Sequence, residues 1–592
     1  MSLLACSKSC ARFVRNAIPV GNKARALWTA LTVAAVLALP IKSGAQTSST
    51  QPTPSDWQPG HTIVNPPVKF DRSAPLPDLF AAYKIPARPT PHHRRTTTTA
   101  PVATPMTPPP APTISAESAA VEQIAQGTRP EATLDASFDG LGADFEGPQG
   151  KAGARNPSDN SLGVGPNEIV QIVNSRMAIF TKKGKKYPAS GKALFGPVVT
   201  NTLFAGFGGP CEKLISGDAV VRYDQLANRW LFVLPIFRHP ADQPNAPYGM
   251  CYAISTSPDP MGSYYRYQFN RPLFPDYPRP AIWSDGYYLP SSTGDTVIQK
   301  HLCAADRKKM LRGQKADEQC VIIDGVSFLN AADIDGRRLP PAGSPELVMA
   351  AGGTQLHKVF EDDGIYVWKF HVNWDDPSKT KLSGPEKITV APYHFLCNGQ
   401  LSKCVPQPGT DVRVDSQGDK LMQRLAYRNF GDHQSIVASH SIDTRAGGGV
   451  RWYEFRLDGS GAPQLFQQGT YAPDGNYRWL PSIAMDHKGD IAVGYSFGGA
   501  SSFPGQRFAA RLAADPNGQL TLHESVLAEG EASQTNTMRW EDYTTLDIDP
   551  SDDCTFWYVG DYYKKAEQNY STRIGAFSLP GCNSKRKVLG FF

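Results

Sequence analysis

Charged residues are scarce in this sequence, and no stretch of it reads as a nucleic-acid-binding surface. Asp, Glu, Lys and Arg make up 19% of the 592 residues, and the formal net charge is only +5. The region that we expect to fold contains no basic helix and no run of Lys and Arg. The sequence therefore gives no support for nucleic acid as a partner.

Several signatures of enzymes and metal proteins are absent as well. The chain has no H-E-x-x-H motif, no phosphate-binding loop and no dinucleotide-binding fingerprint. It also has no C-x-x-C pair, which argues against a zinc ribbon. We therefore predict no cofactor and no metal, and we assign no catalytic residue.

Long apolar runs are missing except near the N-terminus. Five basic residues precede the run "ALWTALTVAAVLALP", and "IKSGAQ" follows it. Positive charge, a short apolar stretch and small residues before the cleavage point are typical of a secretory signal. We predict a signal peptide over 1–45, because the run is shorter than the ~20 residues that span a bilayer. An uncleaved membrane anchor is the alternative.

The cysteines support export. Removal of the signal leaves eight, an even number, and an exported chain with even cysteines favours disulfides over metal. The connectivity cannot be deduced from the sequence, and our prediction is that sequence neighbours pair. The predicted pairs are Cys211 with Cys251, Cys303 with Cys320, Cys397 with Cys404, and Cys554 with Cys582. The expected location is secreted or periplasmic.

Composition divides the rest of the chain. Residues 46–134 are rich in Pro, Thr, Ser and Ala, as in "TPHHRRTTTTAPVATPMTPPPAPT", and we predict a disordered linker there, with a short helix near 115–127. Residues 135–582 alternate short runs of Val, Ile, Tyr, Phe and Trp with Gly, Asp, Asn and Pro turns. Residues 583–592 are a predicted tail.

Internal repeats predict the fold of 135–582. "RWLPSIAMDHKGDIAVGYS" aligns with "RWEDYTTLDIDPSDDCTFWY", and looser copies begin at Asp159, Asp218, Arg279 and Asp432. Each copy reads as a strand, a tight turn and a second strand. Units of this kind some 50 to 85 residues apart are typical of propeller blades with loop insertions. We predict an all-β chain forming a β-propeller of about seven four-stranded blades, with a stack of sandwiches as the alternative.

A family resemblance points the same way. The segments "NPSDNSLGVGPNEIVQIVNSRMAIFTKKG", "CYAISTSPDPMGSYYRYQF", "YPRPAIWSDGYYLPSS" and "RNFGDHQSIVASHSID" resemble motifs of a family of uncharacterised secreted bacterial propeller-like proteins. The resemblance covers nearly all of 135–582. It implies export and an all-β fold, and it transfers no catalytic residue.

The stretch "RWEDYTTLDIDPSDDCTFWYVGDYY" contains six carboxylates that separate into two groups. Asp542 and Asp549 lie seven residues apart, so an extended strand would separate them by roughly 23 Å. The second group, around Pro550, is typical of a turn capped by Asp, and it departs from the alternating pattern of a calcium loop. The two groups cannot form one site.

The first group aligns with other repeats at the start of an inner strand. Four blades are therefore expected to direct a carboxylate at the mouth of the central channel, with arginines beside them. The predicted ligand-binding residues are Asp159, Asp218, Asp432, Asp542, Arg279, Arg478 and Arg539. The alternative is that these charges pair with one another and hold the blades together.

Two other sequence patterns favour a structural role over a catalytic or sugar-binding one. "GYSFG" matches G-x-S-x-G at Ser496, but Gly and Pro follow where a nucleophile elbow needs a helix. Trp230, Trp368, Trp452 and Trp557 recur on predicted strands, which favours packing between blades over sugar stacking. The predicted function is a secreted binding or scaffold module whose mouth engages a glycan, peptide or envelope partner. The alternative is a glycoside hydrolase with paired carboxylates at the mouth.

Overall fold

The computed structural model describes residues 51–83, 114–153, 156–239, 243–293, 299–326, 328–355, 360–399, 403–565 and 569–582. The predicted signal peptide, the centre of the predicted linker (84–113) and the predicted tail lie outside the described residues. Residues 49–592 form one compact unit, and the following paragraphs concern that unit alone.

Antiparallel strands in consecutive groups of four build the unit, as predicted for an all-β chain. The first three groups are β7 (Ser161–Val164), β8 (Glu168–Val173), β9 (Arg176–Thr181) and β10 (Ala193–Val199); β11 (Val220–Asp224), β12 (Arg229–Ile236), β13 (Tyr248–Ser255) and β14 (Tyr264–Arg271); and β15 (Ala281–Ile282), β16 (Gly286–Ser292), β17 (Gln299–Asp306) and β18 (Glu318–Asp324).

The remaining groups continue the pattern. They are β19 (Asn330–Asp335), β20 (Glu346–Ala351), β21 (Ile365–His371) and β22 (Lys381–Ile388); β25 (Leu425–Asn429), β26 (Gln434–Asp443), β27 (Gly448–Leu457) and β28 (Pro463–Tyr471); β29 (Tyr477–Met485), β30 (Ile491–Gly499), β31 (Ser502–Arg511) and β32 (Ser525–Ala528); and β33 (Thr545–Ile548), β34 (Phe556–Tyr562) and β35 (Ser571–Ser578). The last three strands are completed by β4 (Thr133–Asp139).

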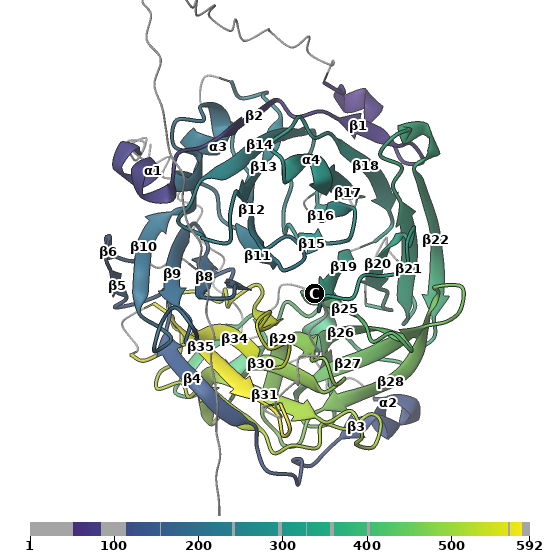
Figure 1. Cartoon of the computed structure of the whole chain (residues 1–592). Coiled ribbons are helices and arrows are strands. Elements are labelled where there is room, and N and C mark those ends of the chain that lie inside the picture. The colour runs from purple at the N-terminus through teal and green to yellow at the C-terminus, as the bar shows by residue number, and fades with distance from the viewer. Residues whose placement is uncertain are drawn as a thin grey trace, which may run out of the picture. The chain divides into compact units, whose positions relative to one another are not determined.

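The groups follow one another around a centre, the arrangement of a β-propeller (Figure 1). The first strand of each group lies innermost: β7 packs beside β11 and β33, β15 beside β19, and β29 beside β25 and β33. Inner strands β19 and β25 pair directly, in parallel, which joins two groups into one nine-stranded sheet. Pairing of β4 with β35 closes the circle with a strand from the other end of the unit.

Apolar residues fill both faces of these sheets because each sheet is packed against its neighbours. β12, with the sequence RWLFVLPI, is buried from its second residue onward. Trp230, Trp368, Trp452 and Trp557 are all buried, in agreement with the prediction that they pack between blades. The predicted local pairing of all eight cysteines is also confirmed.

Part of the predicted disordered linker is folded, which corrects the sequence-based boundary. β1 (Ile63–Asn65) adds a fifth strand beside β18, and β2 (Lys69–Arg72) adds one beside β14. β3 (Glu122–Gln123) pairs with β28. These segments form backbone hydrogen bonds with the exposed outer strands of the propeller. The pairing compensates for a composition with too few apolar residues to form a core of its own.

The other elements are short. The helices are α1 (Leu76–Ala82), α2 (Ala116–Ala120), α3 (Gly209–Lys213) and α4 (Arg307–Met310), with 3-10 turns η1 (Pro54–Asp56), η2 (Thr200–Phe204), η3 (Pro377–Lys379) and η4 (Leu396–Gly399). Two small hairpins are β5 (Glu146–Gly147) with β6 (Gly150–Lys151), and β23 (Val405–Gln407) with β24 (Thr410–Val414). None of the described helices is both long and apolar enough to cross a membrane.

Candidate functional site

Three predicted carboxylates meet where the inner strands begin. Asp159 precedes β7, Asp218 precedes β11 and Asp542 precedes β33, and their backbones have φ values of 48°, 57° and 74°. Asp is one of the few residues that adopt this left-handed conformation readily. The repeat alignment therefore identified equivalent backbone positions, and the structure brings these three side chains together.

Asp159 is the most enclosed of the three. It is fully buried, and Asn174 donates from Nδ2 to its Oδ2 at 2.6 Å. Its Oδ1 has no hydrogen-bond partner among the described residues, although the Asp218 carboxylate is in hydrogen-bonding contact with Asp159. Burial, followed by the charge of Asp542, raises the pKa of Asp159 well above its ordinary value. Burial and the charge of Asp159 do the same to the pKa of Asp218.

Further carboxylates that the sequence did not single out join this group. Asp276 contacts Asp218, and Asp415 lies against Asp542 and Asp419. We call Asp159, Asp218, Asp276, Asp415, Asp419 and Asp542 the closed-end cluster. The missed signal was an Asp in the segment that leads into an inner strand: Asp276 precedes β15, and Asp415 and Asp419 precede β25. Tyr277 and Gln417, beside these aspartates in the sequence, have φ values of 52° and 46°, like the aligned aspartates.

Four basic side chains surround the closed-end cluster. Arg539 forms ion pairs with Asp542 and, at 3.2 Å, with Asp415, as expected of a residue at the mouth. The ammonium of Lys420 lies 2.7 Å from Asp419. Arg279 donates to Asn330 Oδ1 at 2.8 Å and stacks 4.2 Å over the Tyr277 ring. Burial lowers the pKa of Lys300 to about 8.

The mouth is covered, contrary to the expectation of an open channel entrance. The connection between β22 and β25, residues 389–424, contains η4, β23, β24 and the Cys397–Cys404 disulfide, and we call it the cap. Gln417 of the cap donates to Asp542 Oδ1 at 2.9 Å, and Asp415 N donates to Met538 O at 2.9 Å. Asp159 and Asp415 are fully buried and Asp542 is 7% exposed. A large ligand has no access to these three carboxylates in this conformation, whereas Asp218 and Asp276 are only partly buried.

The channel below the cluster is filled by a second set of charges. Arg424 lies 2.9 Å from Asp333, 2.5 Å from Asp335 and 3.2 Å from Asp547, and it is 3% exposed. These residues come from β19, β33 and the residue before β25, so the pairs join inner strands from different parts of the chain. Burial raises the pKa of Asp547 to about 6 even though Arg424 lies beside it.

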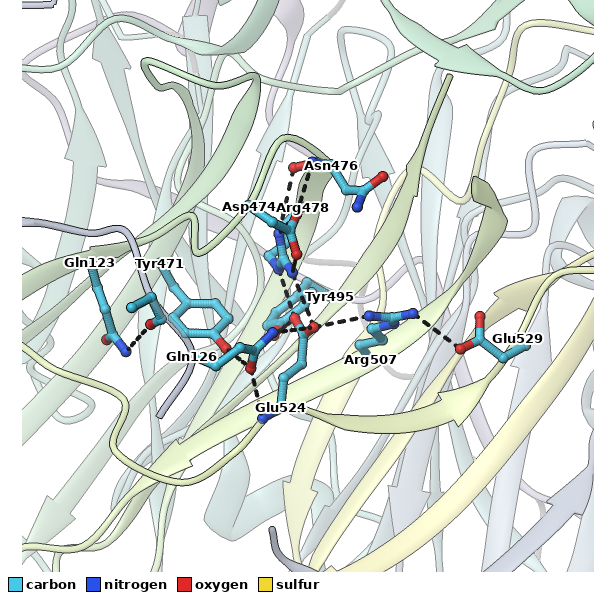
Figure 2. Close-up of polar contacts among 11 residues, drawn as sticks. Gln123, Gln126, Tyr471, Asp474, Asn476, Arg478, Tyr495, Arg507, Glu524 and Glu529 are labelled. Carbon is cyan, nitrogen blue, oxygen red and sulfur yellow. Dashed lines mark hydrogen bonds and ion pairs between the residues drawn. The ribbon is translucent and has the colours of Figure 1, made fainter. Parts of the chain in front are cut away.

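Arg478 does not reach the closed-end cluster, which corrects its predicted place at the mouth. Its guanidinium is buried between Asp474 and Glu524, at 2.9 and 2.7 Å, and Tyr495 and Arg507 contact the same glutamate (Figure 2). Burial opposes ionisation of Glu524, but Arg478 holds its pKa below the ordinary value.

The N-terminal segment takes part in the same network. Tyr471 donates to Gln126 Oε1 at 2.9 Å, and Gln126 donates to Glu524 at 3.3 Å. The Arg478 network therefore fastens β28 to β31 and the segment after β3, a structural role.

Asp432 also lies elsewhere, because it belongs to the turn between β25 and β26 and not to the start of an inner strand. The repeat alignment had the wrong register there, since β25 begins seven residues earlier at Leu425. The Asp432 side chain is 82% exposed and lies 2.9 Å from His433 Nδ1. It lines an open cleft with Pro341, Asn429, Gly431, His433, Gln434, Leu457, Asp458 and Gly459.

Two remaining sequence signals have structural explanations. Ser496 is buried on β30, where it donates to Glu541 Oε2 at 2.6 Å and accepts from Trp540 at 2.8 Å. Asp552 caps its own turn by accepting from the backbone of Cys554 and Thr555. Neither residue has the environment of a catalytic group.

Three potential metal ligands from His, Cys, Asp or Glu come close enough to share one ion at two places in the described chain, and neither place suits a metal. The groups are Cys303, Glu318 and Cys320, and Asp486, His487 and Cys554. All three cysteines are in disulfides, so they offer no thiolate. Among the described residues, no three carboxylates of the closed-end cluster lie close enough together to form such a group.

Comparison with known proteins identifies no family. No protein-family model matches the chain, and no curated protein matches it. The family resemblance noted from the sequence therefore stays a prediction.

Solved structures with low similarity include propellers of several kinds. Plexin A in complex with Semaphorin 1b, from Drosophila, is 9% identical over 76% of this chain and 88% of that chain, with a TM-score of 0.32. The WD40 domain of SCAP from fission yeast is 9% identical over 70% and 84%, with a TM-score of 0.30.

A GH43 β-1,3-galactosidase with galactodeoxynojirimycin is 11% identical over 55% of this chain and 97% of that chain, with a TM-score of 0.25. Similarity at these values carries no argument about activity or ligand. The all-β, propeller-type fold of this chain rests on its own strand pairing.

Proposed function

We propose that this chain is an exported, seven-bladed β-propeller that works as a binding module. Seven inner strands, β7, β11, β15, β19, β25, β29 and β33, each begin one group, which supports a count of seven blades. Four disulfides and the N-terminal apolar run support export to an oxidising compartment.

The open cleft at Asp432 is the observation that carries the binding proposal. Its cavity volume is about 290 Å³, just below the usual range of drug-sized ligand sites. Carboxylate, amide and imidazole groups line it, so it offers both donors and acceptors. The His433 ring stacks on Phe430 with centroids 4.7 Å apart, which fixes its orientation. A glycan, which presents many hydroxyls, fits this chemistry best.

The carboxylates of the cleft do not favour the hydrolase alternative. A glycosidase needs one carboxylic acid with a raised pKa and a second, ionised carboxylate across an open cleft. Asp432 and Asp458 both line the cleft, but His433 lowers the pKa of Asp432, and Ser460 and the Ala462 backbone lower that of Asp458 to about 2. Asp159 and Asp218, whose pKa values are raised, contact each other beneath the cap.

Binding is tested by screening the mature chain against a glycan panel and titrating the best ligand by calorimetry. We expect Asp432→Ala and His433→Ala to weaken binding at least 10-fold, with a melting temperature within about 1 °C of wild type. Asp411→Asn, on the exposed side of the cap, is the control and should bind normally. Full affinity in both cleft variants would refute the assignment. Hydrolysis of aryl glycosides that Asp432→Ala abolishes would instead establish the alternative.

A further inference from the structure

A small recess lies in the central channel where the inner strands end. Val164, Ile282 and Ile548, the last residues of β7, β15 and β33, line it together with Ile334 and Pro550. The same three strands begin at the closed-end cluster, so their last residues lie at the opposite, open end of the channel. These five side chains give the recess an apolar rim.

The recess and the open cleft are neighbours on the same face. Asp335, which lines the recess, is the partner of Arg428 in the register of β19 with β25. The residue after Arg428 is Asn429, which lines the cleft. Neighbouring strands lie about 4.8 Å apart, so an oligosaccharide bound in the cleft can extend to the recess.

Charged side chains form the floor of the recess. They come from β11, β19, β33 and the residue before β25, and they are Arg222, Asp333, Asp335, Arg424 and Asp547. Each of these residues is at most 9% exposed. The cavity volume is about 20 Å³, which is room for one water-sized group. The Asp547 side chain is still 13% exposed, so the floor can be reached from solvent.

Two polar atoms of the floor, Arg222 Nε and Asp335 Oδ2, have no hydrogen-bond partner among the described residues. Arg424 donates to Asp333 at 2.9 Å and to Asp335 at 2.5 Å. Arg222, in contrast, donates to Val221 O at 3.4 Å and lies 3.5 Å from Asp333. Buried polar groups are nearly always hydrogen-bonded. A polar group that enters the recess can therefore accept a hydrogen bond from Arg222 and donate one to Asp335.

A hydroxyl group suits these two atoms best. It both accepts and donates a hydrogen bond, whereas an ammonium only donates and a carboxylate only accepts. Charge favours the same choice. An ammonium would lose its hydration beside two guanidinium groups, and a carboxylate would lose its hydration beside three other carboxylates. The recess therefore favours a small, neutral group with one hydroxyl.

We infer that the recess is the subsite for the hydroxymethyl group of a hexose in the bound glycan. The primary hydroxyl binds Arg222 and Asp335, and the apolar rim contacts the methylene carbon. Secondary hydroxyls are attached directly to the sugar ring, which is too large to enter a cavity of about 20 Å³. The inference rests on the proposed function and deepens it, because it names the group of the glycan that this chain recognises.

The principal experiment compares hexosides with analogues that lack this hydroxyl. The methyl glycosides of glucose, galactose and mannose, and the 6-deoxy form of each, are titrated into the full mature chain and followed by saturation-transfer NMR. The titrations extend to about 100 mM, because one monosaccharide buries little surface and binds weakly. We expect at least one hexoside to bind about 10-fold more tightly than its 6-deoxy form, since the analogue leaves Arg222 and Asp335 unpaired.

Arg222→Lys and Asp335→Asn test the floor. The first change keeps a positive charge beside Asp333 and removes the Nε donor, and the second keeps the shape and weakens the acceptor. Each should lower the hexoside affinity about 5-fold or more and reduce the preference over the 6-deoxy form. Arg229→Lys, the same change at a partly exposed residue of β12, is the matched control and should bind like wild type. Two variants guard against one that fails to fold, and the wild-type comparison needs neither.

Equal affinity of the wild type for hexosides and 6-deoxy forms would overturn the inference and indicate that the recess takes water alone. No binding of any hexoside, or full affinity in both floor variants, would overturn it as well. Failure of the proposed function looks different. Binding that Asp432→Ala weakens and the floor variants leave unchanged would keep the glycan-binding cleft and reject the recess. Binding that only the floor variants weaken would keep the recess and reject the cleft.

Discussion

The two ends of strand β25 lie in opposite environments, although the strand is only five residues long. At its start, Arg424 and the cap residues Gln417 and Lys420 are no more than 3% exposed. Arg424 pairs with carboxylates of β19 and β33, Gln417 donates to Asp542, and Lys420 pairs with its neighbour Asp419. At its end, Asp432 is 82% exposed, and His433 beside it is its ion-pair partner among the residues that the structure describes. One end is closed and charged, and the other is open and polar.

The difference shows that charged side chains have two roles in this molecule. Buried charges at the closed end must have partners, because an unpaired one would cost several kcal/mol, and so they join inner strands that are distant in sequence. Exposed charges at the open end are solvated and contribute little to stability. Recognition is therefore best sought at the open end and cohesion at the closed end. Three changes test this division.

Arg424→Ala should have the largest effect. It would leave Asp333, Asp335 and Asp547 facing one another with Arg222, 3.5 Å from Asp333, as the nearest remaining base. We expect the free energy of unfolding to fall by about 3–5 kcal/mol, measured by urea denaturation at pH 7.5.

The matched control for this change is Lys379→Ala. Lys379 is exposed and pairs with the largely exposed carboxylate of Asp376 at 3.2 Å, so its loss should cost less than about 1 kcal/mol. Equal losses in the two variants would remove the contrast between buried and exposed pairs.

Glu541→Gln should have an intermediate effect that depends on pH. Burial raises the pKa of Glu541 to about 8, although Ser496, the Asp561 backbone and Gln506 donate to it. The folded state therefore binds a proton that the unfolded state releases near pH 4.5. The stability from this proton is present at pH 4.5 and lost as pH rises toward 8.

The variant cannot titrate, so its stability should decline less over this pH window, by on the order of 2 kcal/mol. Urea denaturation of both proteins at pH 5, 6.5 and 8 measures the difference. Glu386→Gln, on the exposed strand β22, should leave the wild-type slope unchanged. Parallel curves for Glu541→Gln and wild type would contradict the expectation.

Asp432→Asn should have the smallest effect on stability. The side chain is largely solvated, so the melting temperature should stay within about 1 °C of wild type at pH 7.5 by calorimetry. A drop of several degrees would mean that the turn between β25 and β26 supports the fold, and the open end could no longer be described as free for recognition.

Local sequence patterns predicted much of the fold correctly. Strand and turn residues alternate with a regular period, so the all-β class, the four-stranded repeat and the burial of Trp230 and Trp452 could be anticipated. Sequence neighbours also formed all four disulfides, because each pair lies within one group of strands, in the cap, or between a group and the segment next to it.

The candidate sites were only partly predictable. Asp159, Asp218 and Asp542 share a backbone position that the repeat makes visible. Asp432 lies in a similar sequence motif, but at a different position relative to its strand. Arg478 pairs with Glu524, and the repeat alignment gives no indication of this contact. Contacts between side chains far apart in sequence depend on how blades pack, which a repeat pattern does not specify.

The sequence by itself determined which residues form strands and where turns occur, because these depend on neighbours a few residues away. Only the tertiary structure decided that segments around Ile63 and Phe70 complete outer edges and that the cap closes the mouth. It also decided that Asp276 joins Asp218, and that the open cleft lies at the other end of the same strands. Burial and charge pairing arise between segments hundreds of residues apart, and they exist only once the circle of sheets has closed.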